Sequence, residues 1–275
     1  WSITMSIEWL TALNHMKHFM LEFYRALRTS TSLEPLEVYE QSVLTCFYSA
    51  YKEEAYRKVL SNPLLEEAIN VCSRFIGATN RLSSTAQSMS GQTILYSIRR
   101  IENFTRISGR KTFLILCDCL SLPEYTLIFT EFVHKVSSSD MLFMINPGGK
   151  TKTFEFLTQN YLNVDYSKEP SLEDIANGLA KKLNCSGYTL FREMDRLIHK
   201  FEKVGFTSIR SMVETFHESI SDLTASIKAL STSHTVLLLT DHGYDVMLKD
   251  GRIYPYHRWS GEPSLSIIAP ALVLG

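Results

Sequence analysis

The feature that most constrains the fold is a change of hydrophobic pattern near residue 110. Up to residue 107, apolar residues recur at helical spacing, as in Leu10, Leu13, Met20, Tyr24 and Leu27. After Gly109, short apolar runs alternate with segments of helical spacing. This alternation is typical of an α/β sandwich with a mostly parallel sheet. We therefore predict an all-helical accessory region over residues 1–107, followed by an α/β domain over residues 108–275.

The apolar runs and the helical segments give a coarse secondary structure. Strands are expected at 112–117, 141–145 and 235–240, and a hairpin turns at Asp250-Gly251 between 246–248 and 252–254. Helices are expected at 10–27, 35–51, from residue 63, at 94–107, 123–136, 152–162, 172–183, 189–203 and 207–230, with a Ser-rich connector at 83–91. Residues 269–275 resemble a strand that is cut short, so we expect this chain to be a fragment of a longer protein.

Composition excludes few functions. The 275 residues include 28 basic and 29 acidic side chains, so net charge gives no argument for a nucleic acid or a membrane as partner. No apolar run approaches the roughly 20 residues that span a bilayer, and we expect no membrane partner. The five cysteines are scattered and form no CxxC pair. Reduced thiols in a cytoplasmic protein are the simplest interpretation.

Polar residues follow two of the predicted strands directly. Asp118 follows the run 112–117, and Asp241-His242 follow the run 235–240. Parallel sheets bind ligands at the carboxyl ends of their strands, and carboxylate and imidazole groups together can hold a metal ion. Gly243 permits the sharp turn that would let both Asp241 and His242 reach one cation. A solvated or helix-capping role is the alternative for Asp118.

The segment 146–153 joins the second strand to a helix. Its paired glycines and the following helix N-terminus favour an anion. Thr151 and Thr153 both qualify as a nucleophile toward phosphorus, and Thr151, at the helix start, is our choice. The alternative is a helix N-cap. A Walker A motif is excluded, because Met144 occupies the position of its first glycine.

Three further residues complete the candidate set. Asp195 and His199 are spaced i, i+4 on a predicted helix, which places both on one face, although a surface ion pair would have the same spacing. His257 follows the hairpin, which can fold it back over the strand end that carries His242. A structural histidine among aromatic residues is the alternative. Arg258 or Lys150 could pair with phosphate oxygens.

The order of these residues resembles the alkaline phosphatase superfamily, and most closely its PglZ-domain branch. Members show a strand-end Asp, a Ser or Thr nucleophile, an Asp-x-x-x-His, an Asp-His pair and a final His. The resemblance covers about residues 110–270. Two positions depart from the family pattern: Cys119 replaces a small residue or Gly, and Pro147 precedes Thr151 by four residues.

The resemblance implies an alkaline-phosphatase-like three-layer sandwich with two divalent metal ions, zinc or manganese. The first ion would be held by Asp195, His199 and His257, and the second by Asp118, Thr151, Asp241 and His242. Thr151 would attack phosphorus and form a phosphothreonine that water hydrolyses. The resemblance further implies phosphodiester or nucleotide substrates, nucleic acid among them, and protein partners in phage defence or DNA modification. A catalytically inactive scaffold that assembles a defence complex is the alternative.

Overall fold

The structure is a computed structural model of the 275-residue chain. It describes all residues except 1, 30–32, 85–86, 137–139, 163–169 and 258–263. The helices are α1 (Ser2–Arg28), α2 (Pro35–Tyr51), α3 (Glu54–Arg57), η1 (Pro63–Leu65), α4 (Glu66–Ser84), α5 (Gln87–Ser108), α6 (Leu122–Phe132), η2 (Val133–Lys135), α7 (Thr151–Leu162), α8 (Leu172–Lys182), α9 (Glu193–Phe201) and α10 (Ile209–Leu230). The strands are β1 (Thr112–Cys117), β2 (Met141–Ile145), β3 (Gly187–Phe191), β4 (Thr235–Thr240), β5 (Asp245–Lys249), β6 (Arg252–Tyr256) and β7 (Ile268–Leu274).

The predicted α/β fold is confirmed, with a mixed central sheet in the order β2-β7-β4-β1-β3. β1 pairs in parallel with β3 and β4, whereas β7 runs antiparallel to both β4 and β2. Four strands therefore share one direction, and β7 is inserted against them. Pro270, in β7, lies beyond the last pair of the β4–β7 register, Leu239 with Ala271. Its missing N–H therefore costs that ladder no hydrogen bond.

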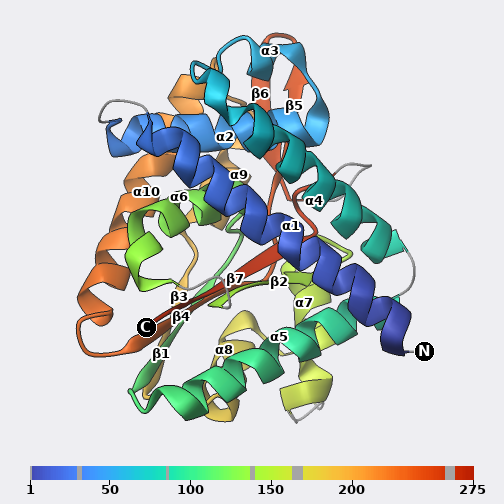
Figure 1. Cartoon of the computed structure of the whole chain (residues 1–275), viewed down its shortest axis with the longest axis vertical. Coiled ribbons are helices and arrows are strands. Elements are labelled where there is room, and N and C mark those ends of the chain that lie inside the picture. The colour runs from blue at the N-terminus through green and yellow to red at the C-terminus, as the bar shows by residue number, and fades with distance from the viewer. Residues whose placement is uncertain (1, 30–32, 85–86, 137–139, 163–169, 258–263) are drawn as a thin grey trace.

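Helices cover both faces of the sheet. Figure 1 shows the strands nearly edge-on, with α5 and α8 below them and α2 and α6 above. β2, β4 and β7 are buried along their whole length, as continuous apolar strands in a covered sheet must be. The hairpin of β5 and β6 lies apart from the central sheet, beside α2 and α3 (Figure 1).

The N-terminal helices share a core with the sheet. The rings of Trp9, on α1, and Phe143, on β2, have centroids 4.1 Å apart, and Phe75, on α4, lies 4.9 Å from the same Phe143 ring. The buried apolar residues of both regions form one continuous cluster. The boundary predicted at residue 107 therefore marks a change of secondary structure and not a gap in the core.

Helix α5 also covers the outer edge of the sheet. Ser97 Oγ donates a hydrogen bond to the Phe143 carbonyl at 3.0 Å, and the Ile145 N–H donates to Thr93 Oγ1 at 3.0 Å. These side chains satisfy backbone groups of β2 that face away from β7. An edge strand covered in this way offers less unpaired backbone to another chain.

One predicted element is wrong over its first residues. The helix expected at 189–203 begins only at Glu193, because Gly187–Phe191 form strand β3. β3 is an edge strand that pairs with β1 alone, and its residues are half-buried or exposed. It therefore lacks the continuous apolar run by which the buried strands were recognised. Its Tyr, Thr and Phe residues are good strand formers, but they gave no alternation strong enough to predict it.

Smaller differences concern helix ends. α4 ends at Ser84 and α5 begins at Gln87, so every described residue of the predicted connector 83–91 is helical. The helix expected to reach Val136 changes to a 3₁₀ turn, Val133–Lys135, and the short helix Glu54–Arg57 was not predicted. Among the described residues, none of the helices combines the length and the apolar character needed to cross a membrane.

Candidate metal centre

Two neighbouring parallel strands bring the first group of polar side chains together. β1 and β4 pair in register up to Cys117 and Thr240, so the residues that follow them meet at the same edge of the sheet. Asp118 follows β1, and Asp241 and His242 follow β4. One ligand atom from each of these three residues lies within 4.8 Å of the others. We call Asp118, Asp241 and His242 the inner triad.

The hydroxyl group of Thr151 lies among the atoms of the inner triad. Thr151 Oγ1 donates to Asp241 Oδ2 at 2.7 Å and lies 3.4 Å from Asp118 Oδ1 and 3.3 Å from His242 Nε2. Thr151 is the first residue of α7, so the positive end of the helix faces the same place. The other candidate, Thr153, packs its hydroxyl over the backbone of Gly148, where an added Cβ would lie 2.1 Å from Thr153 Oγ1.

Asn146, which the sequence analysis did not single out, fixes the loop that carries Thr151. Its fully buried side-chain amide donates to the Lys150 carbonyl at 2.8 Å and to the Asp241 carbonyl at 2.9 Å. The loop is thereby attached directly to the end of β4. Asparagine is common in turns, so the sequence offered no signal that this one spans two strand ends.

Hydrogen bonds set which atoms of the inner triad are free to bind a cation. His242 Nδ1 lies 2.8 Å from the Gly243 carbonyl, which can only accept, so Nδ1 carries the proton and the lone pair of Nε2 faces Thr151. Asp241 Oδ1 accepts from the N–H groups of Cys119 (3.1 Å) and His242 (2.8 Å), which leaves Oδ2 for Thr151. A metal-binding histidine is oriented in this way by its second nitrogen.

The backbone around these residues is closely packed. Cys119 adopts a left-handed conformation with φ of 64°, a backbone conformation that favours glycine. A Cβ at Gly243 would lie 2.6 Å from the Leu265 carbonyl oxygen, so no other residue fits at this position without a shift. The turn after β4 therefore depends on glycine through close approach.

The second group joins helix α9 to the hairpin. Asp195 Oδ1 lies 3.5 Å from His199 Nε2 and 3.6 Å from His257 Nε2, and the two imidazole nitrogens lie 3.1 Å apart. We call Asp195, His199 and His257 the outer triad. Its donor atoms also lie within 4.8 Å of one another. The side chain of His199 is 52% exposed, whereas that of His242 is 1% exposed, so the outer triad opens to solvent and the inner one does not.

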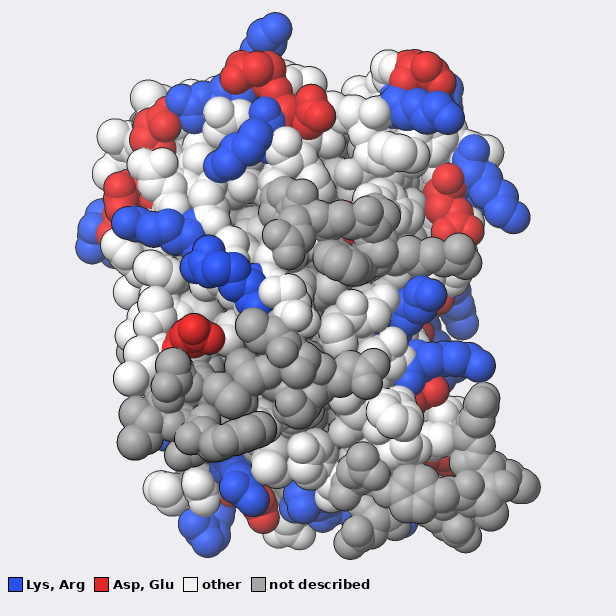
Figure 2. Space-filling model, turned by 90° about the vertical axis from the view of Figure 1, so that its right-hand side faces the viewer, with Lys and Arg blue, Asp and Glu red and all other residues white. Residues whose placement is uncertain are grey.

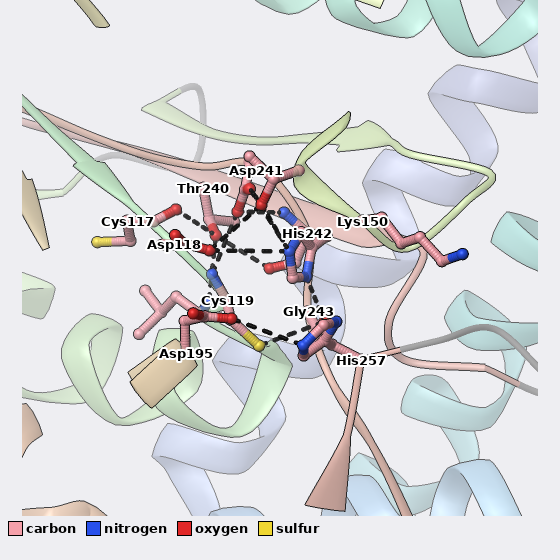
Figure 3. A network of polar contacts seen from close by, with 12 residues as sticks. Cys117, Asp118, Cys119, Lys150, Asp195, Thr240, Asp241, His242, Gly243 and His257 are labelled. Atoms are coloured by element: carbon pink, nitrogen blue, oxygen red, sulfur yellow. Dashed lines mark hydrogen bonds and ion pairs between the residues drawn. The ribbon is translucent and has the colours of Figure 1, made fainter. Parts of the chain in front are cut away.

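A short bridge between backbones brings His257 to α9. The Phe206 N–H donates to the Ile253 carbonyl at 2.7 Å, and the Ile253 N–H donates to the Phe206 carbonyl at 2.9 Å. This bridge ties β6 to the segment that follows α9. Figure 3 shows His257 below His242, with Asp195 to its left, and the rings of His242 and His257 have centroids 5.4 Å apart. The two triads are therefore neighbours.

Burial dominates the electrostatics of this region. Burial raises the pKa of Asp118, the charges of Asp241 and Asp195 raise it further, and His242 and Arg192 act in the opposite direction. Burial also raises the pKa of Asp241 and lowers that of His242. Three carboxylates and three imidazoles this close together are costly without a neutralising charge. Divalent cations would provide it, and the nitrogen and oxygen donors fit zinc or manganese.

Of the two residues predicted to bind phosphate, the structure describes only Lys150. Lys150 is exposed, and its ammonium group points away from both triads in Figure 3. The tight turn before α7 directs the Lys150 side chain outward, and phosphate binding by Lys150 stays a prediction. Arg258 lies outside the residues that the structure describes.

Arg192 is a cation that the sequence analysis missed. It is exposed and follows β3 directly, and the Asp118 N–H donates to the carbonyl of the preceding Phe191 at 2.8 Å. Arg192 therefore lies at a strand end adjacent to that of Asp118, three residues before Asp195. Its position was hidden because β3 was predicted as part of a helix. Correct recognition of the strand would have placed it at the same sheet edge as the triads.

The sequence matches no protein-family model and no curated protein sequence at a significant level. The side chains of the two triads and Thr151 are therefore the basis for a proposed function.

Proposed function

We propose that this chain is a metal-dependent phosphoesterase of the alkaline phosphatase type, with Thr151 as its nucleophile. The observation that carries this proposal is the position of Thr151 Oγ1, at hydrogen-bonding distance from Asp241 Oδ2 (2.7 Å) and 3.3 Å from His242 Nε2. A hydroxyl among metal-binding atoms, at a helix N-terminus, is well placed to attack an anionic phosphoester. The order of the site residues along the chain supports the same reaction.

The donor chemistry defines two proposed ion sites. The inner triad with Thr151 would hold one ion, and the outer triad would hold the other. When bound, two divalent ions would lower the pKa of the attacking hydroxyl and stabilise the negative charge of the entering and leaving oxygens. Zinc and manganese both suit this mixture of imidazole and carboxylate ligands.

The protein side chains have separate tasks in this reaction. Thr151 Oγ attacks phosphorus, the bond from phosphorus to the leaving alcohol or nucleoside oxygen breaks, and the hydroxyl proton leaves toward Asp241 Oδ2, its hydrogen-bond acceptor. Water then attacks the phosphothreonine, and Thr151 is restored. The backbone N–H groups at the start of α7 would bind the phosphoryl oxygens, and Arg192, whose charge acts on Asp118, would serve the same purpose.

Phosphodiesters and nucleotides are the proposed substrates. On the face drawn in Figure 2, acidic and basic residues are interspersed among the described residues, so this face provides no large surface of one charge. On this face, a long nucleic-acid duplex would lack the extended basic surface that it needs. Participation in phage defence or DNA modification comes from the family resemblance alone.

The deciding experiment measures turnover and metal content together. Wild-type protein with Mn²⁺ or Zn²⁺ should release p-nitrophenol from bis-p-nitrophenyl phosphate, and Thr151→Ala should reduce kcat by at least about 10³-fold, since the nucleophile is lost. Thr153→Ala should retain most of the activity. Elemental analysis of protein purified without chelator should return close to two transition-metal ions per chain.

Two results would contradict the proposal. Turnover retained by Thr151→Ala would exclude Thr151 as the nucleophile. A chain that binds fewer than one ion and shows no turnover would instead support the scaffold alternative, in which the domain keeps its shape and assembles a complex.

A further inference from the structure

Two tyrosines of helix α2 reach buried carboxyl groups next to the inner triad. Tyr39 donates its hydroxyl proton to Glu124 Oε1 at 2.5 Å, and Tyr244 donates to the same oxygen at 2.6 Å. The Ser121 N–H donates to Glu124 Oε2 at 3.0 Å. Glu124 is fully buried, so these donors replace all of its contact with water. A buried carboxyl group of this kind is retained only where its partners are held in place.

The second tyrosine, Tyr51, holds the start of the hairpin. Its hydroxyl donates to Asp245 Oδ1 at 2.7 Å and accepts from the Val246 N–H at 3.3 Å. Asp245 Oδ1 also accepts from the Leu265 N–H at 2.7 Å, and Oδ2 accepts from Ser264 Oγ at 2.8 Å. Asp245 is thus the point where α2, the hairpin and the segment before β7 meet.

These contacts involve residues that lie between His242 and His257 in the sequence. Tyr244 and Asp245 follow the Asp241-His242-Gly243 turn directly, so only Gly243 separates Tyr244 from His242 of the inner triad. Asp245 is the first residue of β5, and the hairpin that it begins ends at Tyr256, directly before His257 of the outer triad. Helix α2 is therefore linked to two consecutive residues between His242 and His257. Tyr39 is linked to Tyr244 through Glu124, and Tyr51 bonds Asp245 directly.

The same network continues to the loop that carries Thr151. Ser264 Oγ and Ser266 Oγ lie 2.9 Å apart, and the Ser266 carbonyl accepts from the Gly243 N–H at 3.0 Å. A Cβ at Gly149 would lie 2.7 Å from Ser266 Oγ, so this loop packs directly on the serine segment. Displacement of Asp245 would therefore be transmitted to both the hairpin and the nucleophile loop.

We propose that α2 is a positioning element of the metal centre, which sets the spacing between the inner and outer triads through Tyr39 and Tyr51. The N-terminal helices then complete the site and are not merely an accessory region. This inference rests on the proposed function for its catalytic consequence, although the placement of the chain can be measured independently. Residues that hold metal ligands from behind commonly change metal affinity or activity by about 10- to 100-fold when they are replaced.

The test compares three tyrosine variants of one helix in the full chain. Tyr51→Phe and Tyr39→Phe each remove one hydroxyl from the network. Tyr48→Phe is the matched control, because Tyr48 lies on α2 and its hydroxyl makes no hydrogen bond to another described residue; its ring contacts with Lys52 and Arg57 do not need that hydroxyl. Ser264→Ala removes another partner of Asp245 without a change in α2 and provides a second route to the same displacement.

Two readouts are expected to change. Amide hydrogen exchange measured by mass spectrometry should become at least about fivefold faster over residues 241–257 in Tyr51→Phe and Ser264→Ala, with exchange over β1 unaltered. In Zn²⁺ titrations against a competing chelator, Tyr51→Phe should weaken the more weakly bound ion by about 10- to 100-fold. Tyr48→Phe should match the wild type in both measurements.

The inference would be overturned by a Tyr51→Phe protein whose exchange over 241–257 overlaps with that of Tyr48→Phe. It would equally be overturned if Ser264→Ala altered this segment while both α2 variants left it unchanged, since α2 would then have no part in it. A wild-type chain that binds no zinc would refute the proposed function, while faster exchange in Tyr51→Phe would still support the role of α2.

Discussion

At the scale of single residues, the side chains of the candidate metal centre are oriented by hydrogen bonds. One polar atom of Asp241 and of His242 is bonded to the backbone, and the other stays available to bind a cation. Asp241 gives one oxygen to two backbone N–H groups and keeps the other for Thr151. His242 gives Nδ1 to the Gly243 carbonyl and keeps Nε2. In the more exposed outer triad, Glu202 Oε1 lies 3.6 Å from Nδ1 of His199 and likewise leaves Nε2 available. Free donor atoms are therefore aimed inward by contacts that lie behind them.

Arg192 provides a prediction at this scale. If its guanidinium group pairs with phosphate oxygens, Arg192→Met should raise KM about 5- to 50-fold with a smaller change in kcat, since a charge-assisted contact with the substrate is lost. Steady-state kinetics with bis-p-nitrophenyl phosphate would measure this, and Lys200→Met, an exposed cation farther along α9, is the control. An unchanged KM in Arg192→Met would show that Arg192 does not contact the substrate.

At the scale of elements, the beginning of α6 shows how a helix end can link distant parts of the chain. Ser121 and Glu124 form a capping box at the N-terminus of α6. The same Glu124 carboxyl group accepts the hydroxyl protons of Tyr39, from α2, and Tyr244, from the turn after β4. Glu124 therefore joins α6, α2 and the turn after β4.

Glu124 therefore predicts a pH dependence of stability. Burial is the largest cause that raises its pKa, from 4.5 to about 7, while its hydrogen bonds act in the opposite direction. The folded chain then binds this proton more tightly than the unfolded chain. Its contribution to the free energy of unfolding is complete below pH 4.5 and is lost as pH rises through about 7.

Urea unfolding of metal-free protein between pH 5 and 8 would measure this loss, which we expect to be on the order of 2 kcal/mol. Glu124→Gln cannot titrate and should flatten the corresponding part of the profile, whatever its effect on absolute stability. An unchanged slope in Glu124→Gln would mean that another buried group, such as Asp118, produces the pH dependence.

At the scale of the whole molecule, the N-terminal helices and the sheet depend on each other. Trp9 and Phe75 pack on Phe143, and α5 satisfies backbone groups of β2 through Thr93 and Ser97. Without these helices, a fully buried strand would become an exposed apolar edge. The chain is therefore expected to fold as one unit despite its two patterns of secondary structure.

A fragment of residues 108–275 tests this expectation. It should lack a cooperative unfolding transition and should bind a hydrophobic dye, because the apolar surface under α1, α4 and α5 is uncovered. Circular dichroism and dye fluorescence would be compared with those of the full chain. A soluble fragment with a sharp thermal transition would instead establish residues 108–275 as an independent domain.

The sequence by itself determined those elements whose signal is local. The strands 112–117, 141–145 and 235–240 are continuous apolar runs, and the structure places them at the predicted residues. The positions of Asp118 and Asp241 at strand ends follow directly from those runs. The i, i+4 spacing of Asp195 and His199 likewise depends only on the helix that carries them.

Only the tertiary structure decided features that depend on which elements become neighbours. β3 is half-exposed because it lies at the sheet edge, and β7 runs antiparallel because its path follows the hairpin and the serine segment. The packing of Thr153 against Gly148, the outward direction of Lys150 and the bridging by Asn146 all depend on the packing around one turn. The hydrogen bonds of Tyr39 and Tyr51 join residues 85 and 194 positions apart, a separation at which sequence pattern carries no information about contact.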